Sequence, residues 1–382
     1  MAVGTGALAL AGATALGVLI SVMARTVVTP PRQNSDDVRV IAADLQAGTL
    51  TLQATPDSMV PGHYGFWFSG DAGHARLGEI LASDPHSVTR RVERVDFGNL
   101  GTARMGRWSG WVYLGPWSLP VPFTNVLIRT EGGQAPAWQI PPAREADAES
   151  GDWAIHVHGR AVRRQEALRA VSVFRDAGYT SLLVSYRNDG DAPFSTDRRY
   201  GLGDTEWQDI DAALDFALAH GAKRVVLMGW SMGGAIVLQT ALRARHRSHV
   251  VGIVLDSPVI NWAEVVAFQG TLLRLPASVA RGAIQVMGHR WGRALTGQSA
   301  PIDFHRLDLV ARAADLRVPV LLLHSDDDGY VPSTASRALA ARRPDLITFV
   351  PFATARHTKL WNHDSEKWTG AIRSWLDDLT AR

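Results

Sequence analysis

The chain shows three successive patterns of hydrophobic and polar residues. Residues 6–24 form an uncharged run of mostly Ala, Leu, Val, Ile and Gly. Residues 38–119 carry short alternating runs broken by Gly, Pro, Asp and Ser, which is typical of strands with one buried face. From residue 120 onward, short apolar runs alternate with longer amphipathic stretches. That alternation predicts repeated βα units, and therefore a mostly parallel sheet covered by helices on both faces.

These patterns divide the chain into segments. Residues 1–25 are predicted to be a transmembrane anchor or signal segment, and residues 26–37, rich in proline and polar side chains, a linker. Residues 38–119 are predicted to form a small β-rich domain, and residues 120–382 an α/β domain. Within the latter, residues from about 259 to 315 interrupt the alternation with helical, proline-broken sequence, which predicts a helical cap.

Individual strands can be assigned in both domains. In the small domain the alternating runs predict strands at 38–42, 49–53, 64–68 and 88–95. In the α/β domain an antiparallel pair is expected at 125–129 and 137–140, followed by strands at 154–157, 181–185, 224–228, 250–255, 318–323 and 347–350. The aromatic residues of the small domain, Tyr64 and Trp108 among them, are interpreted as its core in preference to a binding groove.

The N-terminal apolar run is nearly long enough to cross a membrane as a helix. At about 1.5 Å per residue a helix over residues 6–24 nearly spans a bilayer core. The first five residues carry no basic side chain, whereas a cleaved signal usually begins with one, so an anchor is favoured over secretion. Arg25 and Arg32 follow the run, and the positive-inside rule would place the rest of the chain on the cytoplasmic side.

One motif dominates the α/β domain. Gly229-Trp230-Ser231-Met232-Gly233 lies between an apolar run typical of a buried strand and a run that predicts a helix. A strand that turns sharply into a helix needs glycine where the two backbones nearly touch. Such a turn lifts the Ser231 hydroxyl above the sheet edge, beside the helix N-terminus. The alternative is a glycine-rich turn with an incidental serine, and the strand-before, helix-after context favours the nucleophile.

A serine nucleophile needs a base, and the base needs a group that orients it. The loop after strand 318–323 contains three consecutive aspartates, and Asp328 is chosen because Asp-x-x-Val-Pro stands just before the next predicted helix. The loop after strand 347–350 contains His357. The other interpretations are a solvated acidic turn and a surface histidine. The chain order Ser231, Asp328, His357 favours the catalytic one.

With these residues the chain resembles the α/β-hydrolase superfamily. The resemblance rests on His158-Gly159, on Gly229 to Gly233, on Asp328 to Pro332, on His357 and on the helical insertion after the sixth strand. It implies an α/β-hydrolase fold with a cap insertion, here preceded by the β-rich domain and an N-terminal hydrophobic helix.

The resemblance also implies an acyl-enzyme mechanism. Ser231 attacks a carbonyl carbon, His357 takes the hydroxyl proton and later gives it to the leaving group, and Asp328 fixes the imidazole tautomer. The backbone N–H groups of Met232 and Arg160 are expected to form the oxyanion hole.

More narrowly, the segment Arg356 to Asn362 resembles bacterial prolyl-oligopeptidase and serine-aminopeptidase relatives. The function predicted is a serine hydrolase that cleaves a carboxylic ester or related acyl bond of a small molecule. A prolyl-oligopeptidase-type peptidase, an acyltransferase and a catalytically inert binding or scaffold protein are the alternatives. The β-rich domain is too short for the seven-bladed propeller of such peptidases, which weakens the first alternative.

Composition narrows the choice further. The chain has no cysteine, which removes disulfides and thiolate chemistry, and a formal net charge of only +2. Its arginines are scattered, so no nucleic-acid partner is predicted, and the abundance of Ala, Arg, Gly and Val suggests a GC-rich bacterial genome. His156-x-His158 lacks further residues at ligand spacing, so neither a metal nor another cofactor is predicted. The Arg160 side chain is interpreted as exposed, with a substrate carboxylate as the alternative, and the oligomeric state stays open.

Overall fold

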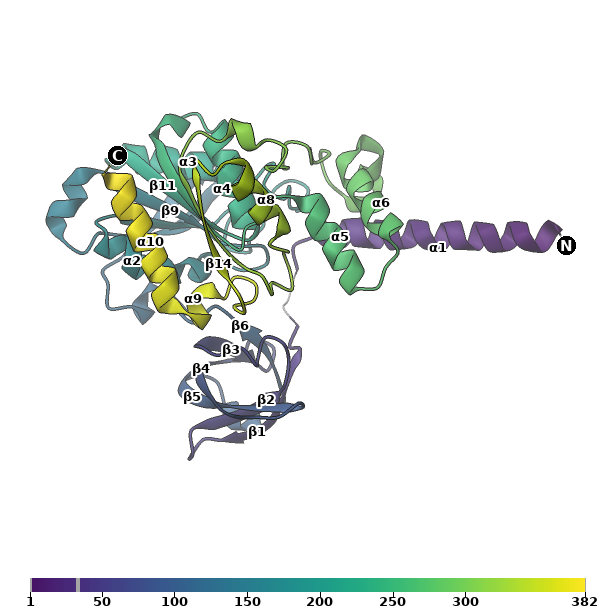
Figure 1. The fold of residues 1–382 in the computed structure, drawn as a ribbon, viewed down its shortest axis with the longest axis horizontal. Coiled ribbons are helices and arrows are strands. Elements are labelled where there is room, and N and C mark those ends of the chain that lie inside the picture. The colour runs from purple at the N-terminus through teal and green to yellow at the C-terminus, as the bar shows by residue number, and fades with distance from the viewer. Residues whose placement is uncertain (1, 32–34, 382) are drawn as a thin grey trace.

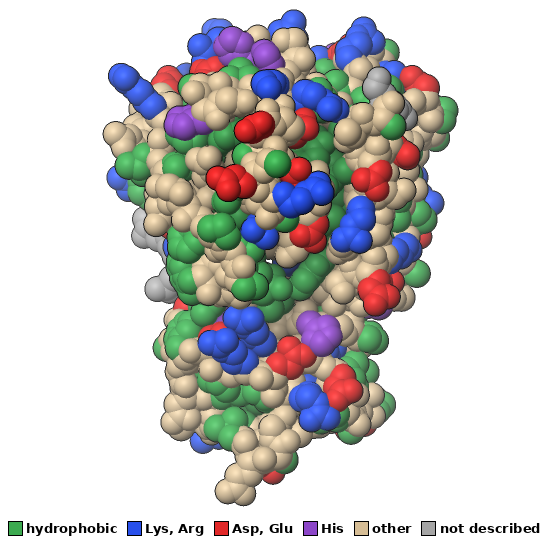
Figure 2. All heavy atoms as spheres, turned by 90° about the vertical axis from the view of Figure 1, so that its left-hand side faces the viewer, with side chains coloured by type: hydrophobic (Ala, Val, Ile, Leu, Met, Phe, Trp, Pro, Cys, Tyr) green, Lys and Arg blue, Asp and Glu red, His purple; other side chains and the backbone are tan. Residues whose placement is uncertain are grey.

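The computed structural model describes residues 2–31 and 35–381, and for residues 2–12 it describes only the helical backbone. Figure 1 shows three parts: a long N-terminal helix α1 (Ala2–Val28), a small β-barrel below, and a larger α/β body above. Figure 2 views the last two parts from the side, and hydrophobic side chains gather at the narrow junction between them.

The β-rich domain is a closed antiparallel barrel. Its strands, in the spatial order β1-β2-β5-β4-β3-β6 with β6 returning to β1, are β1 (Val38–Asp44), β2 (Thr49–Gln53), β3 (Tyr64–Phe68), β4 (Gly73–Ser83), β5 (Ser87–Phe97) and β6 (Met105–Ser109). The sequence pattern missed β4 and β6, because glycine and charged residues interrupt their alternation. Closure of the barrel removes the unpaired strand edges that so small a sheet would otherwise expose.

The barrel core is aromatic around one buried cation. Tyr64 and Trp108 are buried, in agreement with the core interpretation, and their rings lie 4.7 Å apart between centroids. The buried Arg90 guanidinium lies 4.8 Å from the Trp108 ring centroid. It donates hydrogen bonds to the backbone carbonyls of Ser58, Val60, Gly62 and Gly78. Arg90 therefore fixes the loop between β2 and β3 from inside the barrel.

The α/β body contains a mixed sheet. Its spatial order is β14-β13-β12-β11-β9-β10-β8-β7, with strands β7 (Thr124–Thr130), β8 (Gly133–Ile140), β9 (Asp152–Val157), β10 (Thr180–Val184), β11 (Arg224–Trp230), β12 (Val250–Asp256), β13 (Val320–Ser325) and β14 (Ile347–Phe352). Strands β9 to β14 are parallel, while β7 and β8 form an antiparallel pair, as predicted, and β8 runs antiparallel to β10.

Helices cover both faces of this sheet. The elements around it are α2 (Val171–Asp176), α3 (Trp207–Ala219), α4 (Met232–Arg243), α8 (Thr334–Arg342), α9 (Leu360–His363) and α10 (Ser365–Thr380). Residues of α3, α4 and α8 share one apolar core, and residues of α2 and α10 share a second core on the opposite face. Successive strand residues alternate between the two: Leu227 belongs to the first and Met228 to the second.

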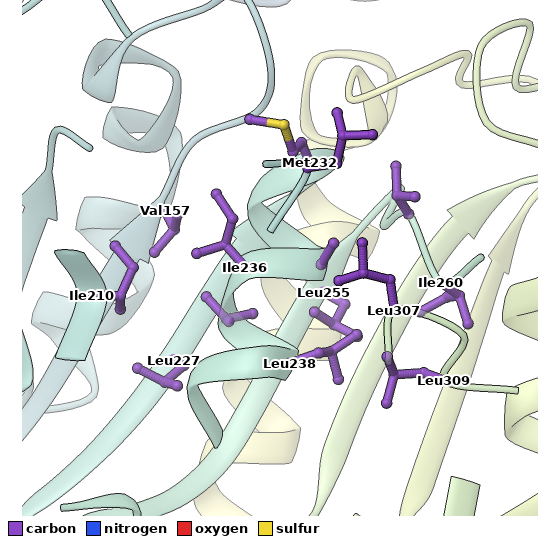
Figure 3. Packing of buried hydrophobic residues seen from close by; sticks show 14 of the residues in the cluster. Val157, Ile210, Leu227, Met232, Ile236, Leu238, Leu255, Ile260, Leu307 and Leu309 are labelled. Carbon is purple, nitrogen blue, oxygen red and sulfur yellow. The ribbon is translucent and has the colours of Figure 1, made fainter. Parts of the chain in front are cut away.

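Helix α4 forms the centre of the first core. Figure 3 shows Ile236 and Leu238 of α4 gathered with Leu227 and Leu255 from the strands and with Leu307 from the C-terminal part of the predicted cap. Burial of such aliphatic side chains contributes roughly 1.5–3 kcal/mol each. The helix that begins directly after Ser231 is therefore among the most tightly held elements of the body.

The predicted cap contains three helices, α5 (Trp262–Leu272), α6 (Ala277–Gly288) and α7 (Arg293–Thr296). Figure 1 shows α5 and α6 beside the C-terminal half of α1, away from the barrel. Met23 and Ala24 of α1 are buried in the same apolar core as Ala280 and Ala283 of α6. The N-terminal helix is thus packed into the cap.

The structure corrects two predictions for the N-terminus. In the part of the chain that the structure describes, no helix is long and apolar enough to cross a membrane, so the transmembrane anchor predicted within residues 1–25 is not supported. Helix α1 also continues to Val28, into the predicted linker 26–37, of which residues 32–34 lie outside the described residues. The predicted location, with the body on the cytoplasmic side, stays a prediction.

We expect Arg90→Met to lower the free energy of unfolding by about 3 kcal/mol or more, because it leaves several buried carbonyls without a donor. The matched control is Arg91→Met, whose exposed guanidinium pairs with Glu79 at the surface and should matter by less than about 1 kcal/mol. Urea unfolding of both variants measures the difference. Equal effects would contradict the structural role of Arg90.

Candidate active site

Ser231 occupies a strained turn between β11 and α4. Its backbone has φ 50° and ψ −117°, a conformation that L-residues rarely adopt. A Cβ on Gly229 would lie 2.4 Å from the Gly233 carbonyl oxygen, and a Cβ on Gly233 would lie 2.2 Å from the Val157 carbonyl oxygen. Both glycines are therefore required by close backbone approach. The turn leaves Ser231 Oγ beside the first turn of α4.

The structure brings Ser231, His357 and Asp328 together from three loops. His357 Nε2 lies 3.0 Å from Ser231 Oγ, and His357 Nδ1 lies 2.7 Å from Asp328 Oδ2. These loops follow β11, β14 and β13, whose carboxyl ends meet at one edge of the sheet. Asp328 is buried and His357 is mostly covered, so the serine hydroxyl lies in a hydrogen-bonded chain shielded from bulk water.

The three consecutive aspartates have separate partners. Asp326 pairs with Arg337 on the surface of α8. Asp327 accepts a hydrogen bond from Ser325 Oγ at 2.6 Å and one from the Arg356 backbone N–H at 2.9 Å. Asp328 is the one that reaches His357. The turn geometry decides where each carboxylate points, and it directs Asp328 toward His357.

The Asp328 carboxylate is held in its ionised form. Burial alone would raise its pKa, but the adjacent His357 and His324 outweigh this effect and hold the pKa well below its ordinary value. The backbone N–H groups of Tyr330 and Val331 also donate to its Oδ1, at 2.7 and 2.8 Å. A charge fixed by four neighbours can orient the imidazole and stabilise its protonated form.

The loop after β9 lies close to Ser231, because a Cβ on Gly159 would lie 3.3 Å from the Ser231 Cβ. The Gly159 N–H donates to Glu166 Oε2 at 2.7 Å and is therefore occupied. Among the described residues, no protein acceptor receives the backbone N–H of Arg160 or that of Met232, the first residue of α4. These are the two groups expected to form the oxyanion hole.

The Arg160 side chain differs from both sequence interpretations. Its guanidinium donates to the carbonyl oxygens of Thr26, Val27 and Thr29, at distances of 2.8 to 3.2 Å, and lies 5.4 Å from the Tyr200 ring centroid. Its Nε and Nη2 are therefore engaged within the protein, a role that neither interpretation included. The guanidinium caps the C-terminal end of α1, where the helix dipole favours a cation.

A second set of polar residues, which the sequence did not suggest, lies behind His357. Ser257 Oγ donates to the buried Asp256 carboxylate at 2.9 Å and accepts the Thr358 N–H at 3.0 Å. The buried Arg169 donates to the Thr358 carbonyl at 2.6 Å and to Asn362 Oδ1 at 2.7 Å. One feature of the sequence could have indicated this set: Asp256 stands at the end of a strand, next to the strand that leads to Ser231.

His156 and His158, considered above as zinc ligands, have separate protein partners. His156 Nε2 lies 3.1 Å from Ser181 Oγ, and His158 Nε2 lies 3.1 Å from Asp189 Oδ2. The His158 ring stacks on Tyr186, whose hydroxyl donates to the Gly159 carbonyl at 2.7 Å. These contacts shape the loop that carries Arg160.

Comparison with known proteins fits this geometry. The profile of the Alpha/beta hydrolase family matches residues 151–369, and that of a domain of unknown function matches residues 39–109, the barrel. No curated protein sequence matches the chain. The Alpha/beta hydrolase match covers more than half of the chain, so the chain belongs to the alpha/beta hydrolase family. The prediction of an α/β-hydrolase enzyme is confirmed at this level.

Solved structures show the same fold. The Pyrococcus furiosus esterase Pf2001 aligns with a TM-score of 0.52 at 18% identity, over 70% of this chain and 94% of its own. Est1E from Butyrivibrio proteoclasticus, in its structure with ferulic acid bound, aligns with a TM-score of 0.51 at 17% identity, over 67% of this chain and 100% of its own. At these identities the likeness establishes the α/β-hydrolase fold.

We expect Gly233→Ala to lower the free energy of unfolding by about 1–3 kcal/mol, because the added methyl forces α4 away from β9. Gly370→Ala is the matched control. Its position in α10 has open space for a Cβ, and the substitution should stabilise by up to about 1 kcal/mol. Urea unfolding distinguishes them, and a neutral Gly233→Ala would show that this close approach is not required.

The low pKa of Asp328 predicts a pH-dependent stability. Its folded pKa lies below the ordinary value of 3.8, so its contribution is present above pH 3.8 and is lost as the pH falls toward the folded pKa. We therefore expect the stability deficit of Asp328→Asn to shrink between pH 7 and pH 3. Asp378→Asn, on the exposed face of α10, should change stability little. A deficit independent of pH would contradict this prediction.

Proposed function

We propose that this chain is a serine esterase that works through an acyl-enzyme, with Ser231 as nucleophile, His357 as general base and acid, and Asp328 as the residue that orients the imidazole. The observation that carries the proposal is the hydrogen-bonded chain from Ser231 Oγ through both His357 nitrogens to Asp328 Oδ2, at 3.0 and 2.7 Å. A serine hydroxyl is a weak nucleophile until a base in this position takes its proton.

The proposed reaction has two halves. Ser231 Oγ attacks the ester carbonyl carbon while its proton moves to His357 Nε2, and the resulting oxyanion accepts hydrogen bonds from the Met232 and Arg160 N–H groups. The C–O bond to the alcohol then breaks, and His357 returns the proton to the departing alcohol oxygen. Water repeats the sequence on the acyl-enzyme and releases the acid. Each oxyanion donor is typically worth about 3 kcal/mol of the barrier.

The surroundings of His357 favour an ester with an apolar group. Tyr330 is 57% exposed, and its ring stacks on the His357 imidazole with centroids 5.4 Å apart. Its backbone carbonyl accepts a hydrogen bond from Gln269 of the cap helix α5 at 2.8 Å. This exposed ring offers a flat apolar surface next to the reacting atoms. The ferulic acid bound to Est1E makes a feruloyl ester a natural member of the test panel.

The resemblance to prolyl oligopeptidases supports a peptidase less than the site supports an esterase. Of the residues behind it, Arg356 pairs with Asp57, and Asn362 accepts from Arg169 and donates to the His63 carbonyl. Both side chains are occupied within the protein. A peptidase would cleave the matching anilide, and an acyltransferase would transfer the acyl group to an added alcohol, so both alternatives can be measured on the same acyl group.

We expect a fluorophosphonate probe to label the purified chain at Ser231, as located by mass spectrometry. Ser231→Ala should abolish labelling, and His357→Ala should slow it at least about a thousandfold, since the hydroxyl then lacks its base. With p-nitrophenyl and feruloyl esters, Asp328→Asn should lose about 10⁴-fold in kcat, whereas Asp326→Asn, the matched control, should keep it. A folded chain that is not labelled at Ser231 would overturn the proposal.

A further inference from the structure

The barrel reaches across to the loop that carries His357. Asp57, in the loop between β2 and β3, accepts a hydrogen bond from Arg356 Nε at 2.9 Å with one carboxylate oxygen. Its other oxygen faces Lys359 Nζ at 3.4 Å. Arg356 directly precedes His357, and Lys359 follows it by two positions. One carboxylate of the barrel therefore holds a cation on each side of the histidine.

The His357 loop needs such restraints, because its backbone is strained on both sides of the histidine. Arg356 has φ 61° and Thr358 has φ 51°. Non-glycine residues in this left-handed region each cost roughly 1–3 kcal/mol, and they persist only where the surroundings hold them. From the α/β body, Asp327 holds the Arg356 N–H and Ser257 holds the Thr358 N–H.

The body also holds the Thr358 carbonyl through Arg169, and the barrel supplies further restraints. Asn362 donates to the carbonyls of His63 and Gly110, and its own backbone oxygen accepts the His63 N–H at 3.0 Å. A Cβ on Gly62 would lie 2.1 Å from that same Asn362 oxygen, so the two backbones are in direct contact. The barrel loop thus lies along the segment from Arg356 to Asn362, and Arg90 holds the same loop from inside the barrel.

The charges at this contact are complementary. Asp57 is partly buried, and burial alone would raise its pKa, but Lys359 and Arg356 outweigh this effect and lower it. The carboxylate is therefore ionised at neutral pH and faces two cations in a partly desolvated junction. Ion pairs in such places hold geometry better than exposed ones, because water competes less for the charged atoms.

We infer that the barrel is a positioning domain for the His357 loop, and that Asp57 is the positioning residue through which it acts, by holding Arg356 and Lys359 on either side of the histidine. The catalytic part of this inference rests on the proposed function, in which His357 is the base. It gives the barrel, whose family has no assigned function, a part in the reaction without any contact with substrate.

The consequence is a specific kinetic signature. Asp57 touches neither Ser231 nor the expected oxyanion donors, so its loss should leave substrate binding unchanged. It should instead let the imidazole sample positions away from Ser231 Oγ. A displacement of about 1 Å in a reacting group can cost about a hundredfold in rate. We expect a partial loosening, with kcat of Asp57→Ala about tenfold lower and KM within about twofold of wild type.

The test compares Asp57→Ala, Asp57→Asn and Asp57→Glu in the full chain. The matched control is Asp71→Ala, which removes a barrel carboxylate paired with Arg107 inside the same domain. Asp57→Glu should recover most of the lost kcat, because it restores the charge, and Asp57→Asn should resemble Asp57→Ala. Asp71→Ala should leave kcat unchanged. Circular dichroism confirms that each variant is folded before its kinetics are measured.

A second readout does not depend on activity. Amide hydrogen exchange over residues 353–363 should rise in Asp57→Ala and stay at the wild-type level in Asp71→Ala, since only the first releases the loop. Unchanged exchange there, or a kcat of Asp57→Ala within twofold of wild type, would overturn the inference. Failure of the proposed function would give a different result, namely no probe labelling at Ser231 in the wild-type chain. In that case the hydrogen-exchange result still decides whether Asp57 holds the loop.

Discussion

The close approach of α4 to strands β9 and β11 is the constraint on which the rest of the structure depends. Gly229 and Gly233 allow the helix to begin within van der Waals contact of the strand backbones, and Ser231 takes a strained conformation between them. The strain is held because α4 is buried along most of its length in the larger core. A rigid helix and a rigid sheet together hold one hydroxyl in place, and the other residues of the site come to it on loops.

Those loops are held from outside the sheet as much as from within it. The loop bearing His357 lies between the Asp256–Ser257 pair of the body and Asp57 of the barrel. The loop bearing Arg160 is tied through its guanidinium to the end of α1. Two segments that precede the α/β domain in the chain therefore contact two loops of its candidate active site. The barrel and the N-terminal helix are in this sense parts of one enzyme body.

The sequence by itself determined the elements and the type of chemistry. The hydrophobic pattern predicted most strands of both domains. A strand with one buried face shows alternating apolar residues, and a strand buried on both faces shows a short apolar run. The Gly-x-Ser-x-Gly turn and the order of Ser231, Asp328 and His357 indicated a serine hydrolase. A turn between a strand and a helix rarely requires glycine two residues before and two residues after a serine unless the serine is a nucleophile. The periodicity and the Gly-x-Ser-x-Gly turn are local signals that depend on residues a few positions apart, and the order of the three residues adds only their place along the chain.

Tertiary structure alone decided what joins distant segments. The pairing of Asp57 with Arg356, and the cap of Arg160 on α1, connect residues far apart in the chain, and no periodicity marks them. The same holds for α1, whose apolar run reads like a membrane segment because burial in protein and burial in lipid select similar side chains. Its packing against α6 shows that part of this apolar surface is buried by the cap. Local composition records that a residue is buried or charged, while only the fold determines which partner satisfies it.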